Sequence, residues 1–260
     1  MKILVTFALE NEFAPWRGMH KFRGGKCGAA DALVAEFAGA EVAVVLTGVG
    51  PKQAALAASA VMRSEHEPVN ICISSGLAGG LRPAYPVGHV LAAQSVFSEN
   101  LRNDSESRLI ESSAALISFA AESDAVVVSR FFTANHAVGS AEEKHLLSAK
   151  ADAVEMESFE ILREARAEGI PAVAIRAISD TLDEDLPLDM GEILTEEGHV
   201  SIPRVLGQVA RHPQSLPGLL RLGQNSKRAA ENLAQFLNRY VAKISESAMP
   251  LESRASVAGN

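Results

Sequence analysis

Acidic residues stand at two points of the sequence, each directly after a short apolar run. Glu157 closes the run that begins at Ala153, and Asp180 closes the run that begins at Ala174. Each run predicts a buried strand and the segment between them predicts a helix, which together make a βαβ unit. Open α/β sheets bind ligands at the carboxyl ends of their strands. Two acids in one crevice suit cleavage of a glycosidic bond, because one can protonate the leaving group while another stabilises a cationic sugar.

A third acidic segment follows the first predicted strand. It contains Glu10 and Glu12, within Ala8-Leu9-Glu10-Asn11-Glu12-Phe13. Charged side chains at the carboxyl end of a strand again point toward the ligand crevice. One of the two glutamates can instead cap the following turn, and the spacing does not choose between these readings.

Two glycine-bearing turns also follow predicted strands. They are Thr47-Gly48-Val49-Gly50-Pro51-Lys52 and Ser74-Ser75-Gly76-Leu77-Ala78-Gly79-Gly80-Leu81. Such turns let backbone N–H groups approach a ligand closely. Neither fits the dinucleotide or P-loop pattern, so no dinucleotide or nucleoside triphosphate site is expected. For each turn taken singly, an ordinary tight turn is as good an interpretation.

The elements that must position these residues alternate along the chain. Strands are expected at 3–7, 42–47, 70–74, 89–95, 125–131, 151–155 and 172–178, and helices at 52–64, 141–149 and 158–168. This alternation predicts a single-domain three-layer α/β/α fold with a mixed, largely parallel central sheet. The domain is expected to span 1–246, with a disordered tail at 247–260.

The pattern changes after Asp180. Residues 185–226 form an apolar segment interrupted by prolines, so 202–222 should divide into short helices. The apolar spacing over 225–242 predicts an amphipathic helix.

Composition excludes several function classes. A net charge of -8 over 260 residues argues against broad binding of nucleic acid or of anionic membranes. Cys27 and Cys72 are too few for a disulfide framework, and the scattered histidines predict no metal site. With no signal pattern at its start and no apolar stretch of transmembrane length, the chain is expected to be cytoplasmic.

Five motifs together resemble a known family. They are Ala8 to Glu12, Thr47 to Gly50, Ser75 to Leu81, Val154 to Glu157 and Arg176 to Asp180. In this order they resemble the nucleoside phosphorylase/nucleosidase superfamily, and within it most of all 5'-methylthioadenosine/S-adenosylhomocysteine nucleosidase. The resemblance implies cleavage of the N-glycosidic bond of a purine nucleoside, without a cofactor, by a homo-oligomer.

The resemblance also implies roles for individual residues. Glu157 would hold the ribose hydroxyls, Asp180 would protonate the departing purine, and Glu12 would deprotonate the attacking water. For its role Asp180 must carry a proton at neutral pH, which burial favours. Ser179 would orient Asp180, Phe132 would stack on the base, and Met156 would pack under the ribose. Further substrate contacts are expected from Glu155, Gly79, Ala78, Leu77 and Val49.

Departures from the family pattern bear on the nucleophile. Leu77 stands where the nucleosidases carry serine, and Ser74 stands where the phosphorylases carry a phosphate-binding arginine. A carboxylate at Glu12 would also repel a phosphate dianion. These features favour water. A phosphate site stays open as an alternative, built from Arg17, Arg130 and the amides of Gly48, Val49 and Gly50.

The apolar segment after Asp180 resembles a different branch, the hopanoid-associated phosphorylases. That resemblance implies phosphorolysis of a nucleoside with an apolar 5'-substituent, for which the segment would line a channel. The alternative is a helical pair that packs on the core or at a subunit interface. A non-catalytic nucleoside-binding module is a third possibility, but a binder has no need of Glu12, Glu157 and Asp180 together.

Overall fold

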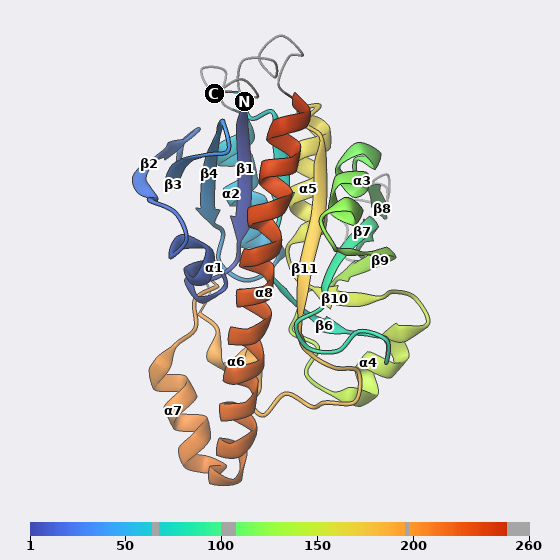
Figure 1. The fold of residues 1–260 in the computed structure, drawn as a ribbon. Helices are drawn as coiled ribbons and strands as arrows, with labels where there is room; N and C mark the ends of the chain where they lie inside the picture. The colour runs from blue at the N-terminus through green and yellow to red at the C-terminus, as the bar shows by residue number, and fades with distance from the viewer. Residues whose placement is uncertain (64–67, 100–107, 196–197, 249–260) are drawn as a thin grey trace.

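In the part of the chain that the structure describes, eleven strands form a mixed central sheet, with helices on both faces (Figure 1). The computed structural model describes residues 1–63, 68–99, 108–195 and 198–248. The strands are β1 (Lys2–Phe7), β2 (Arg23–Cys27), β3 (Ala30–Phe37), β4 (Ala40–Leu46), β5 (Ile71–Ser74), β6 (Leu77–Gly80), β7 (Val90–Phe97), β8 (Leu109–Glu111), β9 (Val126–Thr133), β10 (Ala153–Glu155) and β11 (Ala172–Asp180). The helices are α1 (Glu10–Arg17), α2 (Pro51–Met62), α3 (Ala114–Glu122), α4 (Ala141–Ser148), α5 (Ser158–Ala167), α6 (Met190–Ile193), α7 (Ile202–Arg211), η1 (Pro213–Ser215) and α8 (Leu216–Ala248).

The predicted three layers are confirmed. On one face of the sheet, α2 and α5 pack through small and apolar side chains such as Ala54, Ala58 and Phe159. On the other face α1, α3 and α8 cover the sheet, with Trp16 and Phe236 in their shared core. The alanines of α2 let it lie close to α5, because their small side chains take up little space between the two helices. Burying alanine also costs no side-chain conformational entropy.

Strand β11 is the central element of the sheet. It is buried along its whole length, and its first residues pair with β5 in the parallel order β4-β1-β5-β11. Its later residues pair with β6 on one side and with β7 on the other. Because β6 continues through β10 and β9 back to β7, these five strands close into a ring. The sequence predicted an open sheet, and this closure is a difference that depends on long-range pairing.

Several elements were not expected, namely β2, β3, β6, β8, α1, α3 and α6. A weak local pattern explains β6, which is half glycine, and α1, which has few apolar residues. It does not explain β3 and α3, which are mostly apolar. The proline-broken segment was expected to give only short helices before a helix at 225–242. Instead α8 runs unbroken from Leu216, since Pro217 lies in its first turn, where a missing N–H costs nothing.

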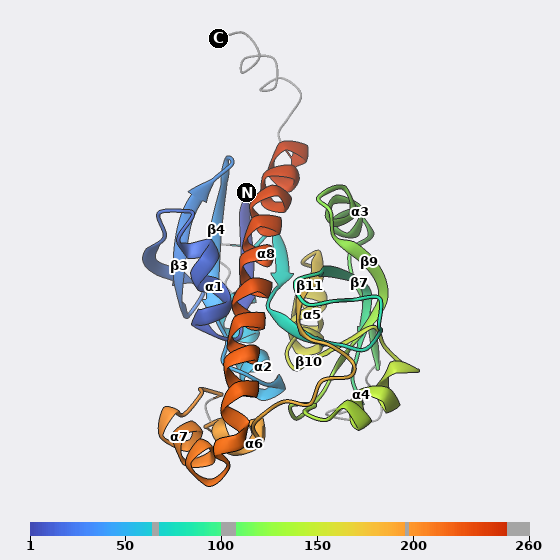
Figure 2. The ribbon, with the colours of Figure 1, turned by 60° about the horizontal axis from the view of Figure 1, so that its bottom comes forward.

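A helical projection extends beyond the carboxyl ends of the parallel strands. It consists of α6, α7, η1 and the beginning of α8, and it lies at the bottom of the molecule in Figures 1 and 2. Helix α8 then returns along the sheet and continues through Ala248. The expected disordered tail falls mainly on 249–260, outside the described residues. Within the described part of the chain, no helix combines the length and apolar character that crossing a bilayer requires.

Candidate active site

A cavity of about 170 Å³ opens at the carboxyl ends of β1, β10 and β11. Ten of the residues singled out from the sequence line it: Glu12, Val49, Leu77, Ala78, Gly79, Glu155, Met156, Glu157, Ser179 and Asp180. The remaining lining residues are Ala8, His136, Ala137, Val138, Val154 and Leu186. Figure 2 brings this end of the strands toward the viewer. Motifs that are far apart in the sequence are therefore adjacent in space.

Glu12 is held at the start of α1 by backbone N–H groups. Its Oε2 accepts hydrogen bonds from the amides of Ala8 and Leu9 at 3.0 and 3.2 Å, and its Oε1 accepts one from Leu77 N at 3.2 Å. Burial raises the pKa of Glu12, while Arg176 and these amides oppose the rise. Glu12 thus both caps the turn and lines the cavity. Glu10 instead pairs with Arg17 at the surface.

The backbone at position 76 passes so close to the carboxylate of Glu12 that it requires a glycine. Gly76 has φ +149°, and a Cβ there would lie 3.2 Å from Oε2 of Glu12. A side chain at this position would both strain the backbone and press on the carboxylate.

Glu157 stands at the N-cap of α5, where its Oε1 accepts a hydrogen bond from Gly50 N at 2.9 Å. Burial raises its pKa to about 8, and the neighbouring Glu155 adds to the rise. Burial therefore favours a protonated Glu157 at neutral pH.

Replacing Glu157 by glutamine should flatten the pH dependence of stability. The ordinary pKa is 4.5 and the folded value about 8, so between these values the folded state binds more protons than the unfolded state. Stability from this group is therefore present at low pH and lost as pH rises, by at most about 1.4 kcal/mol per pH unit. Thermal unfolding across this range, with Glu10→Gln as the surface control, measures the slope. An unchanged slope in Glu157→Gln would contradict the assignment.

Glu155 holds the first turn of α5 and Arg176 in place beside the cavity. Its Oε2 accepts hydrogen bonds from the amides of Glu157 and Ser158 at 3.0 and 2.7 Å, and from Nη2 of Arg176 at 2.5 Å. Thr133 donates its hydroxyl to Oε1. Because its oxygens are occupied in this way, Glu155 positions the first turn of α5 and so positions Glu157.

Asp180 ends β11 beside a β-bulge that follows Ile178. The bulge re-aims the strand, so that both Ser179 and Asp180 face the cavity. The hydroxyl of Ser179 donates to Oδ1 of Asp180 at 2.7 Å, as the predicted orienting role requires. Nζ of Lys144 donates to Oδ2 at 2.5 Å. Asp180 thus accepts one hydrogen bond on each carboxylate oxygen, and the bond from Lys144 was not predicted.

Lys144 is a charged residue at the site that was not predicted from the sequence. It lies on α4 with no exposed surface, and its other donors bond to the carbonyls of Thr181 and Glu184 at 3.0 and 2.7 Å. Lysine is rarely buried, so nothing in the helical pattern of 141–149 marked it. Arg176, by contrast, had a visible signal. A cation inside an apolar strand must find a buried acid, and it contacts Glu155 and Glu157.

The candidate anion pocket is not assembled. Among Gly48, Val49 and Gly50, the amides donate to Ala8 O, Gly198 O and Glu157 Oε1 respectively. Arg17 pairs with Glu10, and Arg130 lies over the ring of Phe97. None of the described residues that line the cavity is an arginine or a lysine.

Phe132 lies elsewhere than expected, and the ring of His136 borders the cavity instead. Phe132 does not line the cavity but is buried against Phe97, with ring centroids 5.0 Å apart. His136 does line it, from the loop after β9, and its ring bonds to Glu143 and Asn135 at 2.8 Å each. Of these two rings, only that of His136 borders the cavity.

The fold thus brings acids from the ends of several strands to one cavity. The profile of the Phosphorylase superfamily matches residues 2–242, and the chain belongs to that superfamily.

Solved structures show the same fold at low sequence identity. A 5'-methylthioadenosine/S-adenosylhomocysteine nucleosidase from Neisseria meningitidis, in complex with methylthio-immucillin-A, is similar at 22% identity and TM-score 0.71, over 93% of this chain and 98% of that one. The native futalosine hydrolase of Helicobacter pylori is similar at 20% identity and TM-score 0.72, over 93% and 97%. An S-adenosylhomocysteine nucleosidase from Streptococcus pyogenes, with 5-methylthiotubericidin, matches at 17% identity and TM-score 0.72, over 94% and 97%.

Proposed function

We propose that this protein hydrolyses the N-glycosidic bond of a purine nucleoside of the adenosyl type. The observation that carries the proposal is one cavity bordered by Glu12, Glu157 and Asp180, each from the end of a different strand. Glycosidic cleavage through a cationic sugar needs a base, an anionic or hydrogen-bonding anchor and an acid. No cofactor enters this scheme. We expect the active form to be a homo-oligomer.

The surroundings of each acid support the role that we propose for it. Glu12 accepts hydrogen bonds from three amides, which hold the carboxylate in place, and its raised pKa makes it a stronger base toward water. Glu157, fixed by Gly50, would receive the ribose hydroxyls. In its ionised form Glu157 would also stabilise the cationic sugar in the transition state.

The proton for the departing base would come from Asp180 and Lys144 acting as a pair. The ammonium of Lys144 passes a proton to the carboxylate, and Asp180 delivers a proton to the purine ring nitrogen as the C–N bond breaks. Lys144 becomes neutral and is recharged after the products leave. Ser179 keeps the other carboxylate oxygen oriented.

Water fits this cavity better than phosphate. The amides that would bind an anion are already used within the protein, and Glu12 would repel a dianion. The named activities of the similar structures, a nucleosidase and a hydrolase, agree with this choice.

Product analysis separates the two nucleophiles. The purified protein is incubated with adenosine, methylthioadenosine or S-adenosylhomocysteine, with and without phosphate, and free base and sugar are resolved. We expect adenine and free sugar at a rate independent of phosphate. Formation of sugar 1-phosphate, and only when phosphate is present, would contradict hydrolysis. The assignment of the active site would still stand.

The second candidate function is phosphorolysis of a nucleoside that carries an apolar 5'-substituent. The observation that favours it is Leu186, which lines both the acidic cavity and a neighbouring cavity of about 220 Å³ that reaches Gly218 and Leu222 of α8. Failure of all three soluble nucleosides to react would direct attention to this connection.

A further inference from the structure

Helix α7 carries its apolar side chains outward. Its one buried residue is Gln208, whose side chain bonds to the backbone N and O of Asp189 at 3.0 Å each. Ile202 and Leu206, four residues apart on one face of the helix, are each 63% exposed. A helix that packs only on its own protein buries the leucine and exposes the glutamine. The reversed arrangement indicates that the outer face of α7 meets something apolar.

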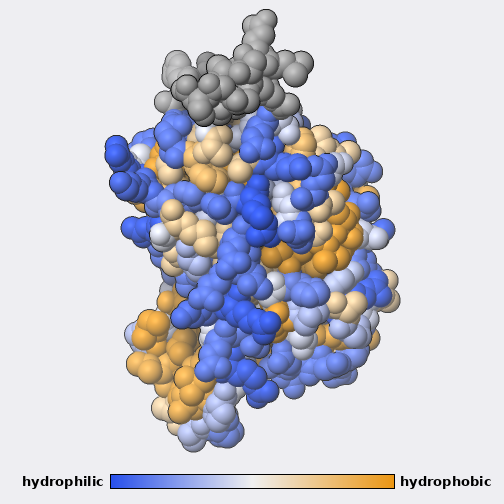
Figure 3. All heavy atoms as spheres, viewed as in Figure 1, coloured by the Kyte–Doolittle hydropathy of each residue, from blue (hydrophilic) through white to orange (hydrophobic). Residues whose placement is uncertain are grey.

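The exposed apolar surface continues onto the start of α8. Leu216 and Leu220, again four residues apart, are 47% and 61% exposed. Figure 3 shows hydrophobic surface over the helical projection at the lower left, bordered by hydrophilic surface along α8. We call the four side chains Ile202, Leu206, Leu216 and Leu220 the apolar stripe.

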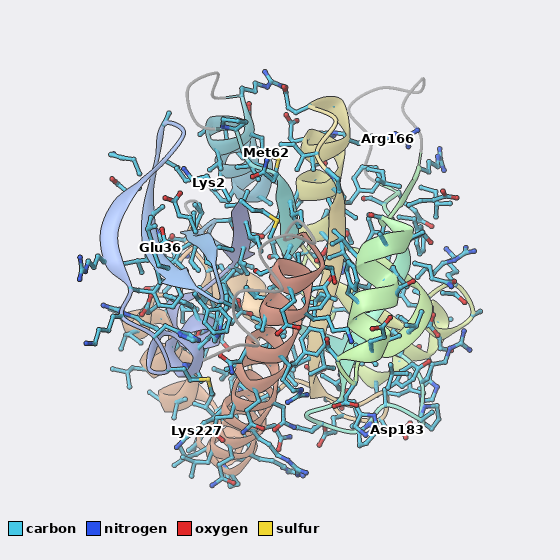
Figure 4. The ribbon with its side chains drawn as sticks, turned by 45° about the horizontal axis from the view of Figure 1, so that its top comes forward. Lys2, Glu36, Met62, Arg166, Asp183 and Lys227 are labelled. Carbon is cyan, nitrogen blue, oxygen red and sulfur yellow. The ribbon has the colours of Figure 1, made fainter. Side chains whose placement is uncertain are left out.

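Cations outnumber acids around the apolar stripe, although Arg211 pairs with Glu192 of α6 and Lys227 pairs with Glu231. From His199 to Ala230 the sequence contains no aspartate or glutamate, although the whole chain has a net charge of -8. The same segment contains five cations, Arg204, Arg211, Arg221, Lys227 and Arg228, all of them exposed. Lys227 extends from the outer side of α8 in Figure 4. This local charge matches an anionic partner and opposes a second copy of the same face, which would bring like charges together.

From these observations we propose that the projection docks on the surface of an anionic lipid bilayer. Bulky apolar residues on one face and arginines or lysines beside it are the features of helices that lie in a membrane interface. The projection is convex and stands out from the sheet, so a deformable bilayer can receive it, whereas a protein partner would need a matching groove (Figures 1 and 2). The local charge acts here in spite of the net charge, because surface potentials fall off within about 10 Å.

The projection also borders the cavity next to the candidate active site. This neighbouring cavity is lined by Asp180 and Leu186 on one side and by Gly218, Arg221 and Leu222 of α8 on the other. Leu216 and Leu220 of the apolar stripe lie on the opposite side of α8 from these residues, because successive residues of a helix are about 100° apart. The docking itself does not depend on the proposed reaction, and its test measures binding alone.

Sedimentation with lipid vesicles tests the proposal on the full chain. Vesicles of neutral phosphatidylcholine are compared with vesicles that also contain anionic phosphatidylglycerol. We expect binding to the anionic vesicles, at least tenfold weaker binding to the neutral ones, and loss of binding as salt is raised. The double variant Ile202→Ser, Leu206→Ser should reduce the partition coefficient at least tenfold.

A matched control is available on the body of the protein. Leu56 on α2 is 60% exposed, so Leu56→Ser removes a similarly exposed side chain away from the projection and should bind vesicles as the unchanged protein does. Failure of the unchanged protein to sediment with anionic vesicles would overturn the proposal. An equal loss of vesicle binding in Leu56→Ser would also overturn it. A third contrary result is that the double variant converts a dimer to a monomer while the unchanged protein does not bind vesicles, since the stripe would then be a subunit contact.

Discussion

Asp180→Asn should lower the turnover of a purine nucleoside by about 10²–10⁴-fold, because an amide cannot pass a proton to the departing base. The variant keeps the size of the side chain, and its carbonyl oxygen still accepts the hydrogen bond from Lys144. Substrate binding should therefore persist. Single-turnover rates and the equilibrium binding of a non-hydrolysed nucleoside analogue separate the two effects.

The control for this variant is Asp183→Asn, three residues along the same loop. Asp183 is largely exposed and pairs with His145. It lines the neighbouring cavity together with Asp180, but not the cavity that Asp180 shares with Glu12 and Glu157. We expect its turnover to match that of the unchanged protein. Unchanged turnover in Asp180→Asn would remove Asp180 from the mechanism and favour a non-catalytic nucleoside-binding module.

Arg176→Met should lower the free energy of unfolding by about 3–5 kcal/mol, because it leaves buried carboxylates without their cation. Arg176 is 1% exposed, and Nη2 contacts Glu155 at 2.5 Å and Glu157 at 3.6 Å, while Nη1 bonds to the carbonyls of Ser74 and Ile175. Denaturant unfolding measures the loss. The exposed pair of Lys26 and Asp31 gives the comparison, since Lys26→Met should cost less than about 1 kcal/mol.

A double variant tests whether the loss comes from the unpaired acid. Adding Glu155→Gln to Arg176→Met removes the uncompensated charge, so the combined loss should be smaller than the sum of the single losses. Simple additivity would mean that packing, and not charge, explains the effect of Arg176.

Much of the site was predictable because its acids follow recognisable strands. The runs ending at Glu157 and Asp180 fold as the predicted β10, α5 and β11, and the strand ends bring them to one cavity. The contribution of Lys144 was not predictable, because it depends on how α4 packs against β11, which is a long-range contact. The displacement of Phe132 has a similar origin. Its packing on Phe97 is a contact between β9 and β7, which the local pattern does not contain.

The sharing of β11 restricts how a ligand can enter. Glu12 and Gly50 follow strands of the open part of the sheet, while Lys144, Glu157 and Asp180 belong to the part built around the ring. These two parts cannot swing apart as rigid lobes, because β11 is paired within both of them. Admission of a substrate must therefore depend on the loops that border the cavity, those carrying His136 and Leu186, and not on a hinge between lobes.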